Sequence, residues 1–271
     1  MGWIASDTAV KRELVCPLNK TTWSYFPLIK VTTLSPNTAI YRFGMDQPWR
    51  SLNLPIGQHL TVGAEINGKP LSRSYTPVSA NWDRGYFDLL IKTYPQGNVS
   101  RYVRDMKIGD KLQVKGPKGQ FVYRPNRVRV FGMIAGGTGI TPMYQIMRAV
   151  LNNPEDRSTI QLIFANVALE DILLKDELDA LAKEHPDRVK VTYCLNTPPT
   201  PAENNGHPWE GYTGFVTEEM IRKHLPAPAS DIQILMCGPP PMMKAMCAHT
   251  DAIGYDKPQA ISKPDDMVFK F

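Results

Sequence analysis

The chain has 271 residues, 42% hydrophobic and 21% charged, which is the composition of an ordinary globular protein with room for two domains. Its net charge of +5 is small, and Lys and Arg form no run of five or more, which argues against a nucleic-acid-binding protein. No apolar run approaches 18 residues, so the sequence predicts no membrane span.

Residues 1–24 are predicted to be an N-terminal extension without the apolar core of a signal peptide. The opening MGWIAS fits the acylation pattern M-G-x-x-x-[ST] at Gly2, but the pattern is short and Trp3 is bulky, so chance explains the match better. The four cysteines have no C-x-x-C pair and no metal-ligand spacing, which predicts reduced thiols and no metal site: Cys16, Cys194, Cys237 and Cys247.

Residues 25–123 are predicted to form an antiparallel β-barrel. The polar stretch RSYTPVS (73–79) is expected to be a strand, although five polar groups and a Pro exceed what solubility requires. One helix is expected over 98–106, with an N-cap from Asn98 or Ser100. Other β-rich runs alternate with turn sequences, at 39–43, 59–66, 86–94 and 111–116.

After a linker at 124–128, residues 129–271 show a different period. Apolar runs alternate there with helical patterns, which predicts a parallel, doubly wound α/β sheet. Residues 196–211 are rich in Pro and Asn and are expected to be a long surface loop. The expected strands are 128–135, 160–166, 189–196 and 232–238, and the expected helices cover 143–151 and 171–185.

Two glycine-containing turns are candidate phosphate sites. AGGTGITPM (135–143) follows a buried strand and opens a helix, so backbone N–H groups and the helix dipole favour an anion there. It is not the G-x-G-x-x-G fingerprint. YPQGNVS (94–100) precedes the helix of the first domain, where ordinary capping explains the pattern equally well. Two such sites on two domains suit two nucleotides.

CGPPPMM (237–243) ends the last predicted strand, and ligands of open α/β sheets lie at the carboxyl ends of strands. Taken alone, Cys237 is better explained as a small buried hydrophobe. Gly238 and the three prolines predict a rigid, open turn, which favours a binding site.

These motifs, in this order, resemble the NADH–cytochrome b5 reductase family, fungal type, of the ferredoxin-reductase-like flavoproteins. The resemblance runs from about residue 25 to Phe271 and rests on GQH, RSYTPVS, LLIKTYPQGNVS, GPKGQF, AGGTGITPM, LIFAN with EDILLKDEL, GFVTEEM and CGPPPMM. It implies FAD in the barrel, NADH in the α/β domain, hydride transfer from NADH to FAD, and single electrons passed to cytochrome b5 or a similar acidic haem protein.

The resemblance also implies roles for single residues. Arg73 pairs with the FAD pyrophosphate, Tyr75 packs along the flavin, and Thr76 reaches the flavin ring. His59 joins Thr76 in a hydrogen-bonded path, and Lys92 lies near NADH. The expected catalytic residues are Thr76, His59, Lys92 and Cys237. The further FAD contacts are Ser74, Ile91, Thr93, Gly97, Asn98, Val99, Ser100 and Thr141, and the NADH contacts are Lys92, Gly136, Gly137, Thr138, Asn196, Cys237, Gly238, Pro239 and Met242.

The sequence departs from the family pattern at Asn98 and Val99, where Lys and Met are commoner, and at Asn196, where many relatives have Asp. Backbone contacts tolerate the first two changes. A basic face is expected to dock the acidic partner, formed by Lys115, Lys118, Arg124, Arg127 and Arg129.

Two alternatives stay open at this point. One is the FAD/NADH module of nitrate reductase, which shares most motifs, although SPNTAIYRF and DILLK favour the free reductase. The other is a non-catalytic, flavin-binding electron-relay subunit, against which Lys92 and Cys237 argue.

Family members often carry an N-terminal membrane anchor, which this chain begins too late to include. The resemblance therefore implies a location at the cytoplasmic face. This chain is then either a soluble fragment of a form tethered to the endoplasmic reticulum or the mitochondrial outer membrane, or a soluble isoform.

Overall fold

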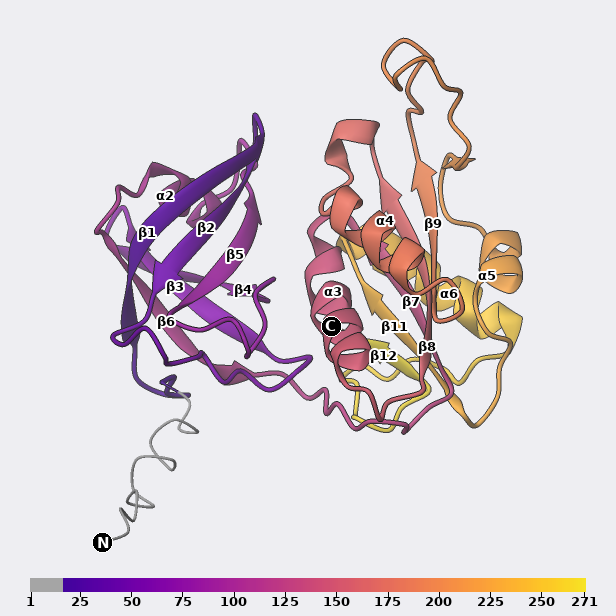
Figure 1. Cartoon of the computed structure of the whole chain (residues 1–271), viewed down its shortest axis with the longest axis horizontal. Helices are drawn as coiled ribbons and strands as arrows, with labels where there is room; N and C mark the ends of the chain where they lie inside the picture. The colour runs from indigo at the N-terminus through magenta and orange to yellow at the C-terminus, as the bar shows by residue number, and fades with distance from the viewer. Residues whose placement is uncertain (1–16) are drawn as a thin grey trace, which may run out of the picture. The chain divides into compact units, whose positions relative to one another are not determined.

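The computed structural model describes residues 17–271, and the chain divides into two compact units between residues 119 and 120 (Figure 1). Each unit contains one six-stranded sheet. The N-terminal sheet is antiparallel and the C-terminal sheet is parallel, which confirms the predicted fold class. Among the described residues, no helix combines the length and the apolar character that crossing a bilayer requires.

The N-terminal strands lie in the order β4-β3-β6-β1-β2-β5. Their inward side chains form the core, in which the Phe87 ring stacks on Phe43 at 5.4 Å and meets Phe26 edge-on at 5.1 Å. β1 was not among the predicted strands, because residues 29–34 are exposed and show no alternation. The bounds are β1 (Ser24–Ser35), β2 (Thr38–Gly44), β3 (His59–Ile66), β4 (Lys69–Tyr75), β5 (Tyr86–Lys92) and β6 (Lys111–Lys118).

The stretch RSYTPVS closes the barrel. Its first residues pair with β3, and β4 ends at Tyr75, opposite Leu60. The chain then crosses to β5, where the Val78 N–H donates to the Asp88 carbonyl at 3.0 Å and the Asp88 N–H donates to Ser79 Oγ at 2.9 Å. The expectation of one strand over 73–79 is therefore wrong, because the segment changes its neighbour in the middle.

Helix α2 (Val99–Asp105) packs against the barrel through Val99 and Val103. Asn98 stands at the predicted N-cap position, but its side chain makes no capping hydrogen bond. Its backbone is already helical, with φ −84° and ψ −67°, whereas a capping residue normally has an extended backbone. The prediction of a side-chain cap here is wrong.

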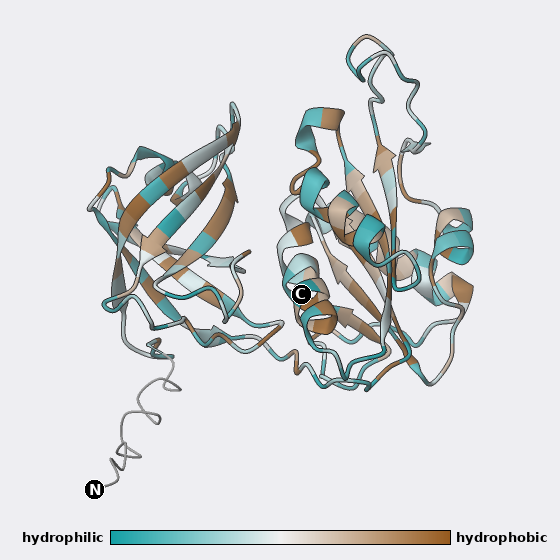
Figure 2. Cartoon of the chain, viewed as in Figure 1, coloured by the Kyte–Doolittle hydropathy of each residue, from teal (hydrophilic) through white to brown (hydrophobic). Residues whose placement is uncertain are grey.

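The C-terminal strands lie in the order β10-β9-β8-β7-β11-β12. Figure 2 shows that hydrophobic residues gather in the strands of both sheets. The strands are β7 (Val130–Gly136), β8 (Thr159–Asn166), β9 (Val189–Leu195), β10 (Tyr212–Thr213), β11 (Ile232–Cys237) and β12 (Val268–Lys270). The helical segments are η1 (Gly137–Gly139), α3 (Ile140–Asn152), η2 (Leu169–Asp171), α4 (Lys175–Glu184), α5 (Glu218–His224) and α6 (Pro240–Ile253).

Helix α6 begins inside the CGPPPMM stretch, which was predicted to be an open turn. Only Gly238 and Pro239 lie between β11 and the helix, while Pro240 and Pro241 form its first turn. Proline suits that position, because its missing N–H would have no partner inside the helix. The prediction of an open turn of three prolines is wrong.

The strand order contains a topological switch point. From β7 the chain continues through β8, β9 and β10 on one side, whereas β11 and β12 lie on the other side. In open α/β sheets the ligand crevice lies at the carboxyl ends of the strands where the order reverses. The carboxyl ends of β7 and β11 are therefore the place to look for a nucleotide site.

The predicted surface loop 196–211 is an excursion between β9 and β10, and it stands out beyond β9 in Figure 1. Its turn is ordered by Glu203, whose Oε2 accepts hydrogen bonds from Thr200 N and Oγ1, both at 2.9 Å. Its base is fixed by Trp209, whose Nε1 donates to the Tyr212 carbonyl at 3.1 Å.

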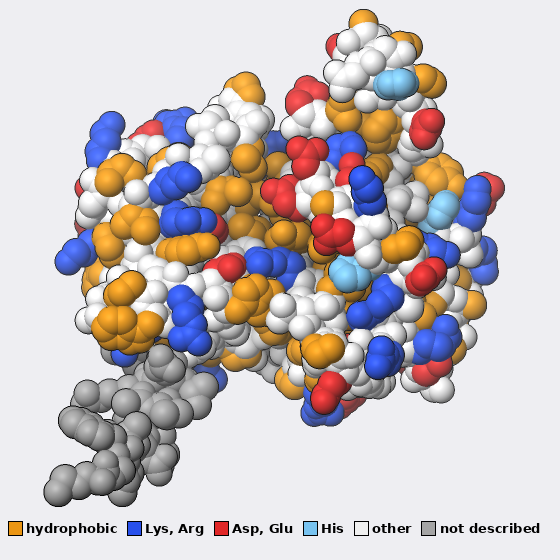
Figure 3. Space-filling model, in the orientation of Figure 1, with side chains coloured by type: hydrophobic (Ala, Val, Ile, Leu, Met, Phe, Trp, Pro, Cys, Tyr) orange, Lys and Arg blue, Asp and Glu red, His pale blue; other side chains and the backbone are white. Residues whose placement is uncertain are grey.

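The two units differ in charge, which the net value of the whole chain hides. Residues 17–119 contain 14 Lys and Arg against six Asp and Glu, a formal charge of +8. Residues 120–271 contain 15 Lys and Arg against 18 Asp and Glu, a formal charge of −3. Figure 3 shows blue side chains with few red ones on the visible face of the N-terminal unit, and a mixture on the C-terminal unit.

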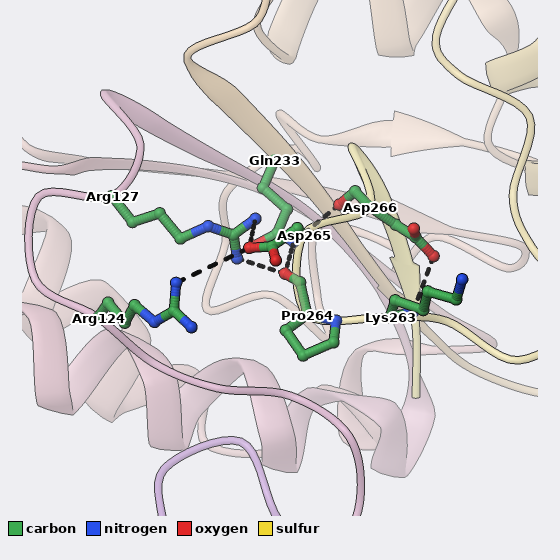
Figure 4. A network of polar contacts seen from close by, with 7 residues as sticks. All are labelled: Arg124, Arg127, Gln233, Lys263, Pro264, Asp265 and Asp266. Carbon is green, nitrogen blue, oxygen red and sulfur yellow. Dashed lines mark hydrogen bonds and ion pairs between the residues drawn. The ribbon is translucent and has the colours of Figure 1, made fainter.

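A polar network fixes the segment that leads into β12 (Figure 4). Arg127 donates to the Pro264 carbonyl and pairs with Asp265 at 3.0 Å. Gln233 Nε2 donates to the carbonyls of Pro264 and Asp266 at 3.0 and 2.8 Å. These bonds hold residues 264–266 against the sheet, so that Val268 can pair with Ile234 in β11.

We expect Arg127→Ala to lower the free energy of unfolding of the C-terminal unit by about 1–3 kcal/mol, because it removes hydrogen bonds to a charged group. Arg127 is only 19% exposed. Arg124→Ala is the control, because Arg124 is 62% exposed and lies 4.0 Å from the same Asp265; it should change stability by less than about 0.5 kcal/mol. Urea denaturation measures both, and equal losses would contradict the assignment.

Candidate functional site

Two backbone turns meet at the switch point. We call residues 136–139 and 237–239 the paired turns. Ala135 in β7 pairs with Cys237 in β11, which sets the two turns side by side. A Cβ at Gly139 would overlap the Cys237 carbonyl, although Gly139 has a φ of −62° that any residue can adopt. Position 139 therefore requires glycine because a larger residue would not fit, and not because of its backbone conformation.

Further contacts hold the paired turns together. A Cβ at Gly136 would overlap Met242 Sδ and would lie 3.0 Å from Pro239 Cδ. A Cβ at Gly238 would lie 3.0 Å from the same sulfur atom. The structure thus brings together most of the residues that the sequence analysis expected to contact NADH: Gly136, Gly137, Thr138, Cys237, Gly238, Pro239 and Met242.

The paired turns have the chemistry of an anion site. Helix α3 begins directly after Gly139 and runs for 13 residues, so unpaired N–H groups and the positive end of its dipole face the turn. Thr141 is buried and its Oγ1 donates to the Thr138 carbonyl at 3.1 Å, which braces the turn. These features fit the pyrophosphate of a dinucleotide.

Cys237 is not built as a nucleophile. Although the residue keeps some exposure, burial raises the pKa of its thiol to about 12, so the thiol stays protonated at neutral pH. Reactive cysteines have a lowered pKa and a nearby positive charge. Within residues 17–271, Cys194, Cys237 and Cys247 are free thiols and no group of His, Cys, Asp and Glu could hold a metal ion; Cys16 lies outside the described residues.

Asn196 lies just beyond β9, at the same edge of the sheet. Its N–H donates to the Asn166 carbonyl at 3.1 Å, and its Nδ2 donates to the Gly214 carbonyl at 3.1 Å. Phe215, which follows Gly214 in the sequence, is 82% exposed. The sequence analysis gave Phe215 no role, and only its exposure marks it as a candidate binding residue.

In the N-terminal unit, Arg73 and Tyr75 lie on one face of β4. Arg73 is exposed, and its one hydrogen bond within the described residues goes to the neighbouring Ser72 carbonyl at 2.7 Å, so most of its guanidinium remains available for a phosphate. Tyr75 packs against the core, and burial raises the pKa of its hydroxyl to about 12. Thr76 follows at the start of the crossing, and Ser74 points to the opposite, exposed face.

A polar cavity of about 400 Å³ lies at the start of α2. Gly97 borders it, and a Cβ there would overlap Ser100 Oγ and lie 3.1 Å from the Tyr94 carbonyl oxygen, so the turn before the helix favours glycine. The volume is in the range of small-molecule sites. The lining supplies Arg101 for a phosphate and carboxylates for hydroxyl groups, and consists of Glu65, Ile66, Asn67, Gly97, Asn98, Arg101, Tyr102 and Asp105.

Several residues expected to contact FAD point elsewhere. The Val99 and Ile91 side chains belong to the barrel core and Ser100 is buried, so these residues offer mainly backbone to a ligand. Lys92 ends β5, and the Thr93 N–H donates to the Asn37 carbonyl at 2.6 Å.

His59 opens β3 opposite Lys118, and a Cβ at Gly119 would lie 3.3 Å from its Nδ1. Burial, with a smaller contribution from the Lys118 charge, lowers the pKa of His59. No hydrogen bond joins His59 to Thr76 in the part of the chain that the structure describes, so the hydrogen-bonded path to the flavin stays a prediction.

The lowered pKa of His59 predicts acid sensitivity. The unfolded chain takes up a proton near pH 6.5, whereas the folded chain resists it, so stability is fully present above that pH and is lost as the pH falls below it. We expect His59→Gln to reduce this loss between pH 7 and 5, as measured by thermal unfolding. The control is His207→Gln, at an exposed position in the 196–211 loop; an equal change in both variants would contradict the role of His59.

A parallel sheet with an anion-binding turn at its switch point, preceded by a barrel with an exposed Arg and a polar cavity, defines a two-domain flavin- and pyridine-nucleotide-dependent oxidoreductase. Residues 25–123 match the oxidoreductase FAD-binding domain family, and residues 133–248 match the oxidoreductase NAD-binding domain family. The FAD and NADH assignments are confirmed at this level.

Curated relatives include NADH-cytochrome b5 reductase 1 of Mycosarcoma maydis, 54% identical over 94% of this chain and 76% of the relative. The enzyme of the same name from Meyerozyma guilliermondii is 56% identical over 91% of this chain and 84% of the relative. The crystal structure of the cytochrome b5 reductase domain of Ulva prolifera nitrate reductase superposes with a TM-score of 0.85 at 35% identity, covering 95% of this chain and 100% of that one. The chain belongs to the NADH–cytochrome b5 reductase family, as the resemblance predicted.

Proposed function

We propose that this chain transfers a hydride from NADH to FAD and passes single electrons onward to cytochrome b5. The observation that carries the proposal is the pair of turns at the switch point of an NAD-binding domain that follows an FAD-binding domain. The names of the relatives support the acceptor. The bound cofactors supply the redox chemistry, and the protein supplies their positions.

At the paired turns, Gly136, Gly137 and Thr138 would present backbone N–H groups to the NADH pyrophosphate. Cys237 and Pro239 would set the depth and angle of the nicotinamide, together with Gly238 and Met242. Hydride transfer requires this alignment, because small misplacements of the reacting atoms slow such steps strongly. A protonated thiol can pack against the ring without reacting with it.

In the barrel, Arg73 and the backbone of Gly97 and Asn98 would hold the FAD pyrophosphate. Tyr75 would pack along the flavin, with Thr76 near the ring and Lys92 and Thr93 at the end of β5. Ser74, Ile91, Val99 and Ser100 would shape this site mainly through their backbone. His59 would act on Thr76 only through an intervening group, because the two side chains are not bonded directly.

The function is tested in two steps. FAD is added to the purified chain, and NADH is then added without oxygen. Loss of the visible absorbance of the oxidised flavin is the expected result. Turnover is then compared with cytochrome b5 and with the haem domain of nitrate reductase. A chain that binds no flavin or is not bleached by NADH would contradict the proposal.

The FAD/NADH module of nitrate reductase is the second candidate, favoured by the 0.85 TM-score to such a domain. The free reductase is preferred because the curated relatives of that name are 54% and 56% identical, against 35% for the nitrate reductase domain. Faster turnover with the nitrate reductase haem domain than with cytochrome b5 would reverse this preference.

We expect Arg73→Ala to weaken FAD binding about ten- to a hundredfold, because a charge-assisted contact is worth roughly 1.5–3 kcal/mol. Arg84→Ala is the control: Arg84 is a second exposed arginine of the barrel, and its Nη1 donates to the Trp49 carbonyl at 3.1 Å. Equilibrium dialysis of FAD measures both variants, and equal FAD affinity in wild type and Arg73→Ala would remove Arg73 from the site.

The three arginines of the basic face expected from the sequence lie beside carboxylates, whereas its two lysines, Lys115 and Lys118, belong to the N-terminal unit. Arg127 pairs with Asp265, which Arg124 also approaches, and Arg129 pairs with Asp231 at 2.8 Å. Lys115 lies 4.3 Å from the centre of the Trp23 ring. The charge of +8 on residues 17–119 instead favours the N-terminal unit as the docking surface for an acidic haem protein.

This surface predicts that kcat/KM for cytochrome b5 falls as ionic strength rises, because screening weakens the attraction. Charge reversal at the exposed Lys69 and Lys111 of the N-terminal unit should lower kcat/KM. Charge reversal at the exposed Lys183 and Lys244 of the C-terminal unit is the control. A flat salt dependence, or a larger effect of the control pair, would contradict docking on the N-terminal unit.

Asn196 would accept a hydrogen bond from an adenosine ribose hydroxyl without repelling a 2′-phosphate. We expect Asn196→Asp to raise the ratio of kcat/KM for NADH to that for NADPH about tenfold, which equals 1.4 kcal/mol. The new carboxylate repels the phosphate, although it also loses the bond to the Gly214 carbonyl.

The matched control is Asn204→Asp in the same loop, where the Asn204 Nδ2 also donates to backbone carbonyls, those of His207 and Pro208, at 3.0 and 3.2 Å. This control makes the same change of charge and of donor farther along the loop. Steady-state kinetics with both cofactors decide the matter. Equal shifts in the two variants, or better use of NADPH by the wild type, would contradict the assignment of Asn196.

A further inference from the structure

Asn166, the last residue of β8, has a side chain that nothing described so far uses. The residue is only 7% exposed, and within residues 17–271 neither its Oδ1 nor its Nδ2 has a hydrogen-bond partner. Buried polar groups are nearly always paired, and an unpaired one destabilises the fold. By contrast, Gln233 has an unpaired Oε1, but its Nε2 bonds two carbonyls.

The position of Asn166 links it to the proposed NADH site. β8 lies between β7 and β9, and its residue Ala165 pairs with Gly136 of the first paired turn. Asn166 is one step further along, where β8 contacts η1. Its carbonyl accepts the N–H of Asn196. The backbone of Asn166 therefore lies between the proposed phosphate turn and the proposed adenosine residue.

The side chain lies on the sheet face that α4 covers. Alternation along β8 puts Asn166 on the same face as Phe164. The Phe164 ring lies 6.4 Å from the ring of Tyr193, whose hydroxyl donates to Asp179 of α4 at 2.7 Å. On this face both amide atoms are sealed from solvent, so the nearest polar groups they can reach belong to the protein itself.

The turn beside Asn166 is open on one side, at Gly137. η1 is a single 3₁₀ turn, a conformation with poorer hydrogen-bond geometry than an α-helix. Gly137 has a φ of +52°, and no atom lies within 4 Å of the place where its Cβ would be. Because η1 contacts β8, the backbone groups of this turn are candidates to pair with the amide of Asn166.

We propose that Asn166 is a positioning residue for dinucleotide binding: when an ADP-containing dinucleotide occupies the turn 136–139, the turn settles onto the Asn166 amide and pairs with it. This inference rests on the proposed NADH site. The unliganded chain bears an unpaired amide, and the liganded chain does not. A dinucleotide that binds the settled turn more tightly than the unsettled turn shifts the chain toward the settled state. Pairing with Asn166 stabilises that state, so the pairing adds to dinucleotide affinity.

A purely structural role of Asn166 predicts that its replacement lowers the melting temperature of the unliganded chain. Our proposal predicts an equal or higher melting temperature and weaker dinucleotide binding. Asn166→Leu keeps the branched shape of the side chain and removes both polar atoms. If Asn166 supports binding, the FAD-loaded variant should have an unliganded melting temperature equal to or above that of the wild type, and should bind ADP-ribose and NADH about tenfold more weakly. The control is Gln233→Leu, which should lower the melting temperature and leave dinucleotide affinity unchanged, because Gln233 already bonds two carbonyls.

Calorimetric titration and thermal unfolding of the full FAD-loaded chain provide both readouts. A wild type that binds neither ADP-ribose nor NADH would contradict the proposed function itself. A wild type that binds, with unchanged affinity in Asn166→Leu, would overturn this inference alone, as would a variant that melts earlier or fails to fold. A second measurement uses the wild type only: the side-chain amide NMR signal of Asn166 should shift and exchange more slowly on adding ADP-ribose, and an unaffected signal would overturn the proposal.

Discussion

The contact between Gly139 and the Cys237 carbonyl is the constraint on which the nucleotide site depends. It leaves no space for a Cβ at Gly139, so the two backbones approach as closely as atoms allow. The pairing of Ala135 with Cys237 fixes the level at which the turns meet. Helix α3 begins at Ile140, directly after Gly139, and α6 begins at Pro240, three residues after Cys237. Both helices therefore start next to this contact.

The many polar residues of the barrel segment 73–79 have a structural reason. The first part of the segment pairs with β3 and the last part bonds to β5, so the crossing between them closes the barrel. Arg73 remains exposed on one side of the crossing, while Tyr75 packs into the core. Closure of the barrel and presentation of the arginine proposed to bind phosphate therefore depend on the same seven residues.

Features that depend on a local sequence pattern were predicted correctly. β3 has the expected bounds 59–66, because its apolar residues alternate cleanly. The glycine-rich turn was recognised because three glycines between a buried strand and a helix exceed the needs of a simple turn. β1 was missed because half of it is exposed, and α6 was missed because its prolines resemble a loop.

Other features depend on residues that are distant in the sequence. The ion pairs of Arg127 and Arg129 could not be predicted, because their partners, Asp265 and Asp231, are more than 100 residues away in the sequence. Asn166 and Phe215 could not be recognised either. The first is distinguished by a buried amide without a partner and the second by an exposed ring, and both properties exist only in the folded chain.

The central claim is that close approach of the paired turns sets the nicotinamide for hydride transfer. Gly139→Ala tests it most directly, because this change adds one methyl group at a φ that alanine adopts freely. Anaerobic stopped-flow reduction of the FAD-loaded variant by NADH is the measurement. The account predicts full retention of FAD and a flavin-reduction rate about 100-fold below that of the wild type. A rate equal to that of the wild type would contradict it.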